Sequence, residues 1–86
     1  MSQASLPGAD FGTFIISLAS SVLIHLGELP DPDRGTTHAD LELAKQSLDV
    51  LGMLREKTRG NLTAEETQLL EQLLYDLRMK YLAKKG

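Results

Sequence analysis

The sequence predicts an all-α protein of three helices, in which a hydrophobic N-terminal helix packs on an antiparallel helical hairpin. Residues 37–58 and 64–83 carry apolar side chains at the three- and four-residue spacing of amphipathic helices. A third segment, residues 11–26, contains no Asp, Glu, Lys or Arg. Loop-forming residues separate the three segments, so we predict one domain over residues 10–86. Residues 1–9 are small and polar, and we predict a disordered leader there.

The first predicted helix, residues 11–26, is apolar on every side. Asp10 can cap its N-terminus, Gly27 offers a left-handed C-terminal position, and the Pro-rich loop 28–37 prevents its continuation. A helix that is apolar all round must be buried all round. We therefore expect this helix to be the central element. Because two companion helices can cover only part of it, we expect a homodimer or a heterologous protein to cover the remainder.

The second predicted helix opens with Thr37 and Asp40, a variant of the capping box in which Asp replaces Glu. It continues to about Thr58, and Gly60 then supplies the left-handed position that ends a helix. Gly52 lies inside this helix, where glycine costs about 1 kcal/mol relative to alanine. We interpret Gly52 as a point of close helix approach or as a local kink.

The third predicted helix covers residues 64–83 and begins with a full capping box, Thr63 and Glu66. Leu62, just before the cap, is placed to pack against the first turns of the helix. The short connection between Gly60 and Thr63 requires the second and third helices to be antiparallel.

Composition narrows the possible functions. The net charge of −3 argues against a general nucleic-acid binder, which would carry a basic patch. Cysteine is absent, so the chain has no disulfide and no thiol nucleophile, and this is compatible with the cytoplasm, where we expect the protein. The apolar segment is shorter than the roughly 20 residues of a membrane-spanning helix. It also lacks the preceding positive charge of a signal peptide.

The two histidines are candidate metal ligands. His25 with Glu28 places two ligands on one helix face, and two ligands do not make a metal site. We expect His25 to be a packed residue near the helix end and His38 to be exposed at the start of the second helix. We therefore predict no metal and no cofactor.

Serine clusters in the first helix, at positions 17, 20 and 21, near His25. A catalytic serine needs an acid and a strained turn, and neither accompanies these residues. We expect the hydroxyl groups to bond back to helix carbonyls, or to mark the side where another helix approaches.

Charged residues on the second helix allow two further hypotheses. The carboxylates Glu42, Asp49 and Glu56 share one heptad spacing, and we expect a solvated face stabilised by Lys45. The basic run 55–59 could hold a phosphate at the next helix N-terminus, although the acidic residues there would repel it. No side chain is therefore assigned to catalysis, and we predict that the protein is not an enzyme.

Partner binding is the more promising use of the remaining side chains. Tyrosine and arginine are enriched at binding hot spots. The third helix carries such residues beside its apolar seam, although the alternative is a purely intramolecular arrangement with Asp76 paired to Lys80. Together with exposed apolar positions of the first helix, the predicted partner-binding residues are Phe14, Ile16, Leu23, Tyr75, Arg78 and Tyr81.

Three strings carry a family resemblance: LGML at 51–54, KTRGNLT at 57–63 and DLRM at 76–79. Over about residues 10–82 the chain resembles a bacterial family of short helical proteins catalogued as a domain of unknown function, the RomX-like domain. The resemblance implies a regulatory adaptor that, with a response-regulator partner, promotes nucleotide exchange on a Ras-like GTPase of cell polarity. It transfers no functional residue.

These observations together predict a small non-catalytic protein–protein interaction module that forms a homo-oligomer or binds such a heterologous partner. A membrane-associated helical protein and a small-ligand-binding protein are the alternatives.

Overall fold

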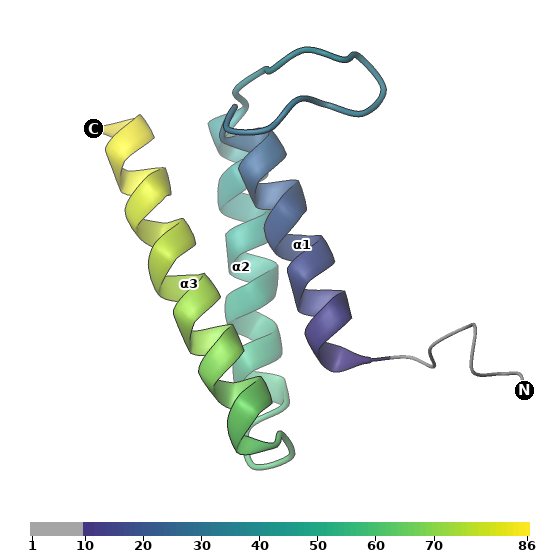
Figure 1. Cartoon of the computed structure of the whole chain (residues 1–86). Coiled ribbons are helices and arrows are strands. Elements are labelled where there is room, and N and C mark those ends of the chain that lie inside the picture. Colours follow the sequence, from purple (N-terminus) through teal and green to yellow (C-terminus); the bar gives the residue numbers. More distant parts are fainter. Residues whose placement is uncertain (1–9) are drawn as a thin grey trace, which may run out of the picture.

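The computed structural model describes residues 10–86 and contains the three predicted helices (Figure 1). They are α1 (Phe11–His25), α2 (Leu41–Lys57) and α3 (Ala64–Lys85). They run up, down and up, so that α2 and α3 form the antiparallel hairpin, as predicted. The predicted disordered leader, residues 1–9, lies outside the described residues.

One buried stripe on each helix forms the core. The buried side chains recur at three- and four-residue spacing, which keeps them on one side of each helix. Within residues 10–86 all of them are apolar, and no buried side-chain polar atom lacks a hydrogen-bond partner. The core comprises Ile15, Ala19, Val22 and Leu26, then Ala44, Leu48 and Leu51, then Leu70, Leu74 and Leu77.

The ends of α1 follow the prediction. The carboxylate of Asp10 accepts hydrogen bonds from the backbone N–H of Thr13 at 3.1 Å and from its hydroxyl at 2.7 Å. Gly27 adopts φ +80°, the left-handed conformation that stops a helix at low cost only for glycine. Both signals act within a few residues, so the local sequence suffices to place them.

The start of α2 differs from the prediction, which placed the cap at Thr37. Asp40 is the N-cap, and its carboxylate accepts from the backbone N–H of Leu43 at 3.2 Å. The reason is a contact with the end of α1: Ala39 forms an isolated antiparallel bridge with Leu26. The backbone N–H of Asp40 also donates to the carbonyl of His25 at 2.7 Å. This pairing holds the chain extended up to Asp40, so the helix begins after it.

The start of α3 confirms the predicted capping box. The Thr63 hydroxyl accepts from the Glu66 N–H at 3.1 Å, and the Glu66 carboxylate accepts from the Thr63 N–H at 2.9 Å. Leu62 packs against the core beside it. Gly60 adopts φ +85° at the turn. The helix continues two residues beyond the predicted end at position 83, to Lys85.

The expectation that the first helix is central is wrong for the single chain. Each helix packs against the other two, and each contributes buried residues to the core. Because α2 and α3 lie on one side of α1, its opposite side remains in solvent, where Phe14 and Ile16 are each 50% exposed. Among the described residues, no helix is both long and apolar enough to cross a membrane.

The Asp10 cap should contribute to the loss of stability of the protein at low pH. Its hydrogen bonds from the Thr13 side chain and backbone lower the pKa of the Asp10 carboxyl. This stabilisation is present when the pH is above about 3.9, the ordinary pKa of Asp. It is lost as the pH falls through the lower pKa that Asp10 has in the folded protein. We expect Asp10→Asn, which keeps a good cap, to lose less stability than the wild type between pH 5 and pH 3.

Urea unfolding at the two pH values measures this difference. Asp33→Asn, in the exposed loop, is the matched control and should behave like the wild type. An unchanged pH dependence in Asp10→Asn would contradict the assignment.

Candidate functional site

The outward side of α1 is an uncharged surface. Thr13, Phe14, Ile16 and Ser17 are exposed there, and we call these four residues the outer face of α1. The helix contains no Asp, Glu, Lys or Arg along its whole length. An exposed surface without charge is unusual for a small protein and marks a candidate contact surface.

The hydroxyl groups on this side are already hydrogen-bonded within the chain. The Ser17 hydroxyl donates to the carbonyl of Thr13 at 3.1 Å, and the Ser21 hydroxyl donates to the carbonyl of Ser17 at 3.4 Å. The prediction that these serines bond back to their helix is therefore confirmed for both. If a partner covered this side, both hydroxyl groups would keep their hydrogen-bond acceptors. Removing water from this side therefore costs less free energy.

A second apolar surface lies on α3. Tyr75, Met79 and Leu82 are 64%, 52% and 56% exposed, and we call these three residues the α3 face. Their spacing of four and three residues places them on one side of the helix. Arg78 follows Tyr75 by three residues and precedes Leu82 by four, so its exposed side chain borders the same face.

Gly52 explains the position of the Arg78 side chain. A Cβ atom built on Gly52 would lie 3.2 Å from Nη2 of Arg78, so the guanidinium occupies the space that a larger residue on α2 would fill. The predicted close approach at Gly52 is thus made by a side chain of α3. The helix α2 runs from Leu41 to Lys57 through this position.

The six predicted partner-binding residues fall into three groups. Phe14 and Ile16 are exposed on α1, whereas Tyr75 and Arg78 are exposed on α3. The remaining two are half-buried and pack against the core: Leu23 and Tyr81. The six residues therefore do not form one surface.

Two exposed residues of the α3 face were missed by the sequence reasoning. Met79 and Leu82 follow Tyr75 by four and seven residues, a spacing that the sequence displays. Methionine in a helix commonly fills gaps in the core, and hydrophobicity alone does not show which side of an amphipathic helix faces its neighbours.

The charged side chains of α2 form surface ion pairs. Lys45 pairs with Asp49 at 3.0 Å, and this hydrogen bond raises the pKa of the lysine. Arg59 donates to Glu56 at 2.8 Å and lowers the pKa of that carboxyl. The predicted solvated face with Lys45 is thus confirmed.

The predicted pair of Asp76 with Lys80 is absent. The amide of Gln72, one turn earlier on α3, instead donates to both carboxylate oxygens of Asp76, at 3.0 and 3.1 Å. The carboxylate is thereby satisfied by a neutral side chain.

The two histidines differ in their exposure to solvent. His25 is half-buried at the end of α1, and His38 is exposed in the loop. Across residues 10–86, no three His, Cys, Asp or Glu side chains are grouped closely enough to hold a metal ion.

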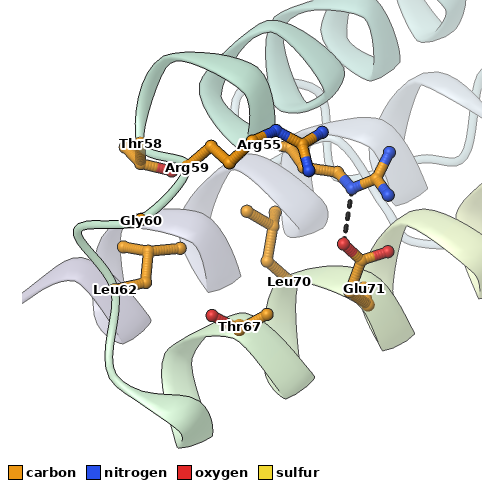
Figure 2. Close-up of a pocket in the computed structure, with 8 residues that line it drawn as sticks. All are labelled: Arg55, Thr58, Arg59, Gly60, Leu62, Thr67, Leu70 and Glu71. Atoms are coloured by element: carbon orange, nitrogen blue, oxygen red, sulfur yellow. Dashed lines mark hydrogen bonds and ion pairs between the residues drawn. The ribbon is translucent and has the colours of Figure 1, made fainter.

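A small pocket lies at the turn between α2 and α3 (Figure 2). Its volume of about 80 Å³ is well below the roughly 300–1,000 Å³ of small-molecule sites. Arg55 donates to Glu71 across the pocket, and Arg59 is paired with Glu56, so a phosphate would have to displace a carboxylate from either guanidinium. The pocket is lined by Arg55, Thr58, Arg59, Gly60, Leu62, Thr67, Leu70 and Glu71.

The comparisons with known proteins identify a family and no activity. The family described as Domain of unknown function (DUF1844) matches residues 8–83. No curated protein and no solved structure matches the chain. The predicted resemblance to a domain of unknown function is confirmed over nearly the whole sequence.

Replacing Gly52 tests the contact between α2 and α3. We expect Gly52→Ala to stabilise the protein by up to about 1 kcal/mol, because alanine favours the helix and the flexible tip of Arg78 can move aside. Urea unfolding measures the change, and Gly52→Ala in an Arg78→Ala background is the control that lacks the contact. A destabilised Gly52→Ala protein would show that the packing at Gly52 cannot adjust.

Proposed function

The chain belongs to the DUF1844 family, and we propose that it is a small non-catalytic protein-interaction module that pairs with a second copy of itself through the outer face of α1. One observation carries the proposal: the least polar helix of the chain leaves Phe14 and Ile16 half exposed on an uncharged side. Exposed apolar side chains of this size favour association, because burying them removes apolar surface from water.

A second copy suits this surface because the surface is uncharged. In a two-fold dimer each patch meets its own copy, so any charged group near the axis would face a like charge. The four residues of the outer face carry no such group, and the Asp10 carboxylate that accepts from the Thr13 hydroxyl lies at the N-terminal end of the face. Its serine side chains are small, and their internal hydrogen bonds allow two helices to approach closely without losing a partner for either hydroxyl.

The expected dimer is of modest strength. Full burial of one Phe or Ile side chain contributes about 1.5–3 kcal/mol, and each is only half exposed here. Two copies of both residues therefore contribute roughly 3–6 kcal/mol, against an association cost of about 4 kcal/mol or more. Close packing along the remainder of the face has to supply the surplus, so dimer formation should depend on protein concentration.

The interactions of the candidate carboxylates support the proposal that the chain is not a catalyst. The carboxylates Asp49, Glu56 and Asp76 are engaged with neighbouring side chains on exposed helix faces. General acid–base chemistry favours carboxyl groups in environments that separate their pKa values, usually through burial. Exposed ion pairs do not provide such environments.

A finer proposal concerns the biological setting. The resemblance to the RomX-like domain supports a cytoplasmic adaptor that acts with a response regulator to promote nucleotide exchange on a Ras-like GTPase. A module that pairs with itself through α1 and presents a separate apolar face on α3 is suited to bringing a further protein to the dimer. An exchange assay with a bacterial Ras-like polarity GTPase and its response regulator tests this: the chain should accelerate release of a fluorescent guanine nucleotide.

Charge substitution tests the dimer. We expect the wild type to approach twice its chain mass of 9.4 kDa in light scattering as its concentration rises. Ile16→Glu should remain monomeric, because dimer formation would bury its charge. Met53→Glu is the matched control: Met53 is also 50% exposed but lies on α2, so this variant should dimerise like the wild type.

Circular dichroism of all three proteins verifies that the helices persist. A wild type that stays monomeric at every concentration, or an Ile16→Glu protein that dimerises normally, would overturn the self-association proposal.

A further inference from the structure

We infer that the α3 face, with Arg78 beside it, binds an amphipathic helix of another protein whose apolar side carries a carboxylate. The inference deepens the proposed interaction function and rests on it, but it uses a different surface of the chain from the outer face of α1. It follows from the spacing of three exposed apolar residues and from the charge next to them.

The spacing of the α3 face fits a helical ligand. Tyr75, Met79 and Leu82 are all more than half exposed and share one side of α3. Between the first and the last of them the helix rises by about 10 Å, or two turns. Partner helices commonly bind such a surface through residues at the same three- and four-residue spacing.

The Arg78 guanidinium specifies the charge of that ligand. Within residues 10–86, Arg78 forms no ion pair and no hydrogen bond through its side chain, although it lies next to the apolar face. The nearby carboxylates of α3 are engaged elsewhere: Glu71 accepts from Arg55, and Asp76 accepts from Gln72. A ligand that covered the face without a carboxylate would strip water from an uncompensated charge, which is costly.

The absence of a side chain at Gly52 leaves room for the tip of Arg78 beside α2. The arginine side chain presents a planar pair of donors, which suits a carboxylate better than a neutral group.

A second copy of this chain fits the α3 face poorly. The midpoint of the face, between Tyr75 and Leu82, falls next to Arg78 and Met79. A two-fold antiparallel contact centred there would bring Arg78 against the same arginine of the other copy. A single acidic helix avoids this repulsion.

Peptide selection on the intact chain tests the inference. The probe is a displayed library of helical peptides about four turns long. Each peptide carries leucine at three positions with the spacing of the α3 face and one randomised position beside them. We expect Asp or Glu to dominate that position on the wild type, and Lys or Arg to replace them on Arg78→Glu.

The matched control is Lys80→Glu, which reverses an equivalent exposed charge on the other side of α3 and should select acidic residues like the wild type. The best acidic peptide, made in soluble form, should bind Arg78→Ala about tenfold or more weakly in fluorescence anisotropy, a loss typical of a charged hydrogen bond. Circular dichroism should show unchanged helix content in each variant.

Several outcomes would overturn the inference: no enriched peptide, no preference for an acid, or the same preference on Arg78→Glu. A fourth is dissociation of the self-associated chain by Leu82→Glu, which would identify a second copy as the occupant. The two proposals remain separable, because Ile16→Glu should abolish dimers while retaining peptide binding.

Discussion

Each helix of this protein can bury only one side, and the remaining features follow from that constraint. Each of the three helices around the single apolar core fully buries only three of its residues. The outward sides of all three must then face solvent or another molecule. On α2 that side carries ion pairs together with the exposed Leu43 and Met53, whereas α1 and α3 present apolar side chains there without such pairs among them. The surplus of apolar surface therefore lies outside the core.

The two exposed apolar faces differ in charge, and this difference separates their proposed partners. The four side chains of the outer face of α1 are uncharged, so a second copy that crosses this face away from the Asp10 carboxylate brings no like charges together. The α3 face is bordered by Arg78, whose positive charge favours a partner that carries a carboxylate. The two proposals therefore use separate surfaces of the bundle, one for a second copy and one for a different protein.

The position of Arg78 also illustrates a compromise between stability and recognition. Glycine inside α2 weakens the helix, and the structure shows that the vacant space is occupied by a guanidinium from α3. Alanine would favour the helix but crowd the group that we propose to contact the partner. Surface ion pairs elsewhere, such as Lys45 with Asp49, are well exposed and contribute little to folding. Their main effect is to keep the other sides of the bundle polar.

The helix ends were predictable from the sequence wherever the signal was local. The caps at Asp10 and Thr63 act on backbone groups three residues away, and Gly27 and Gly60 act through their own backbone conformation. The helical class, the hairpin and the apolar sides of the helices follow from periodicity for the same reason.

Only the tertiary structure decided the features that depend on distant residues. The start of α2 moved to Asp40 because the end of α1 pairs with Ala39, a contact between segments separated by a loop. The exposure of Phe14, in contrast to the half-burial of Leu23, depends on where α2 and α3 lie around α1. Periodicity predicts that a helix has an apolar side. How much of that side is buried depends on the positions of the neighbouring helices.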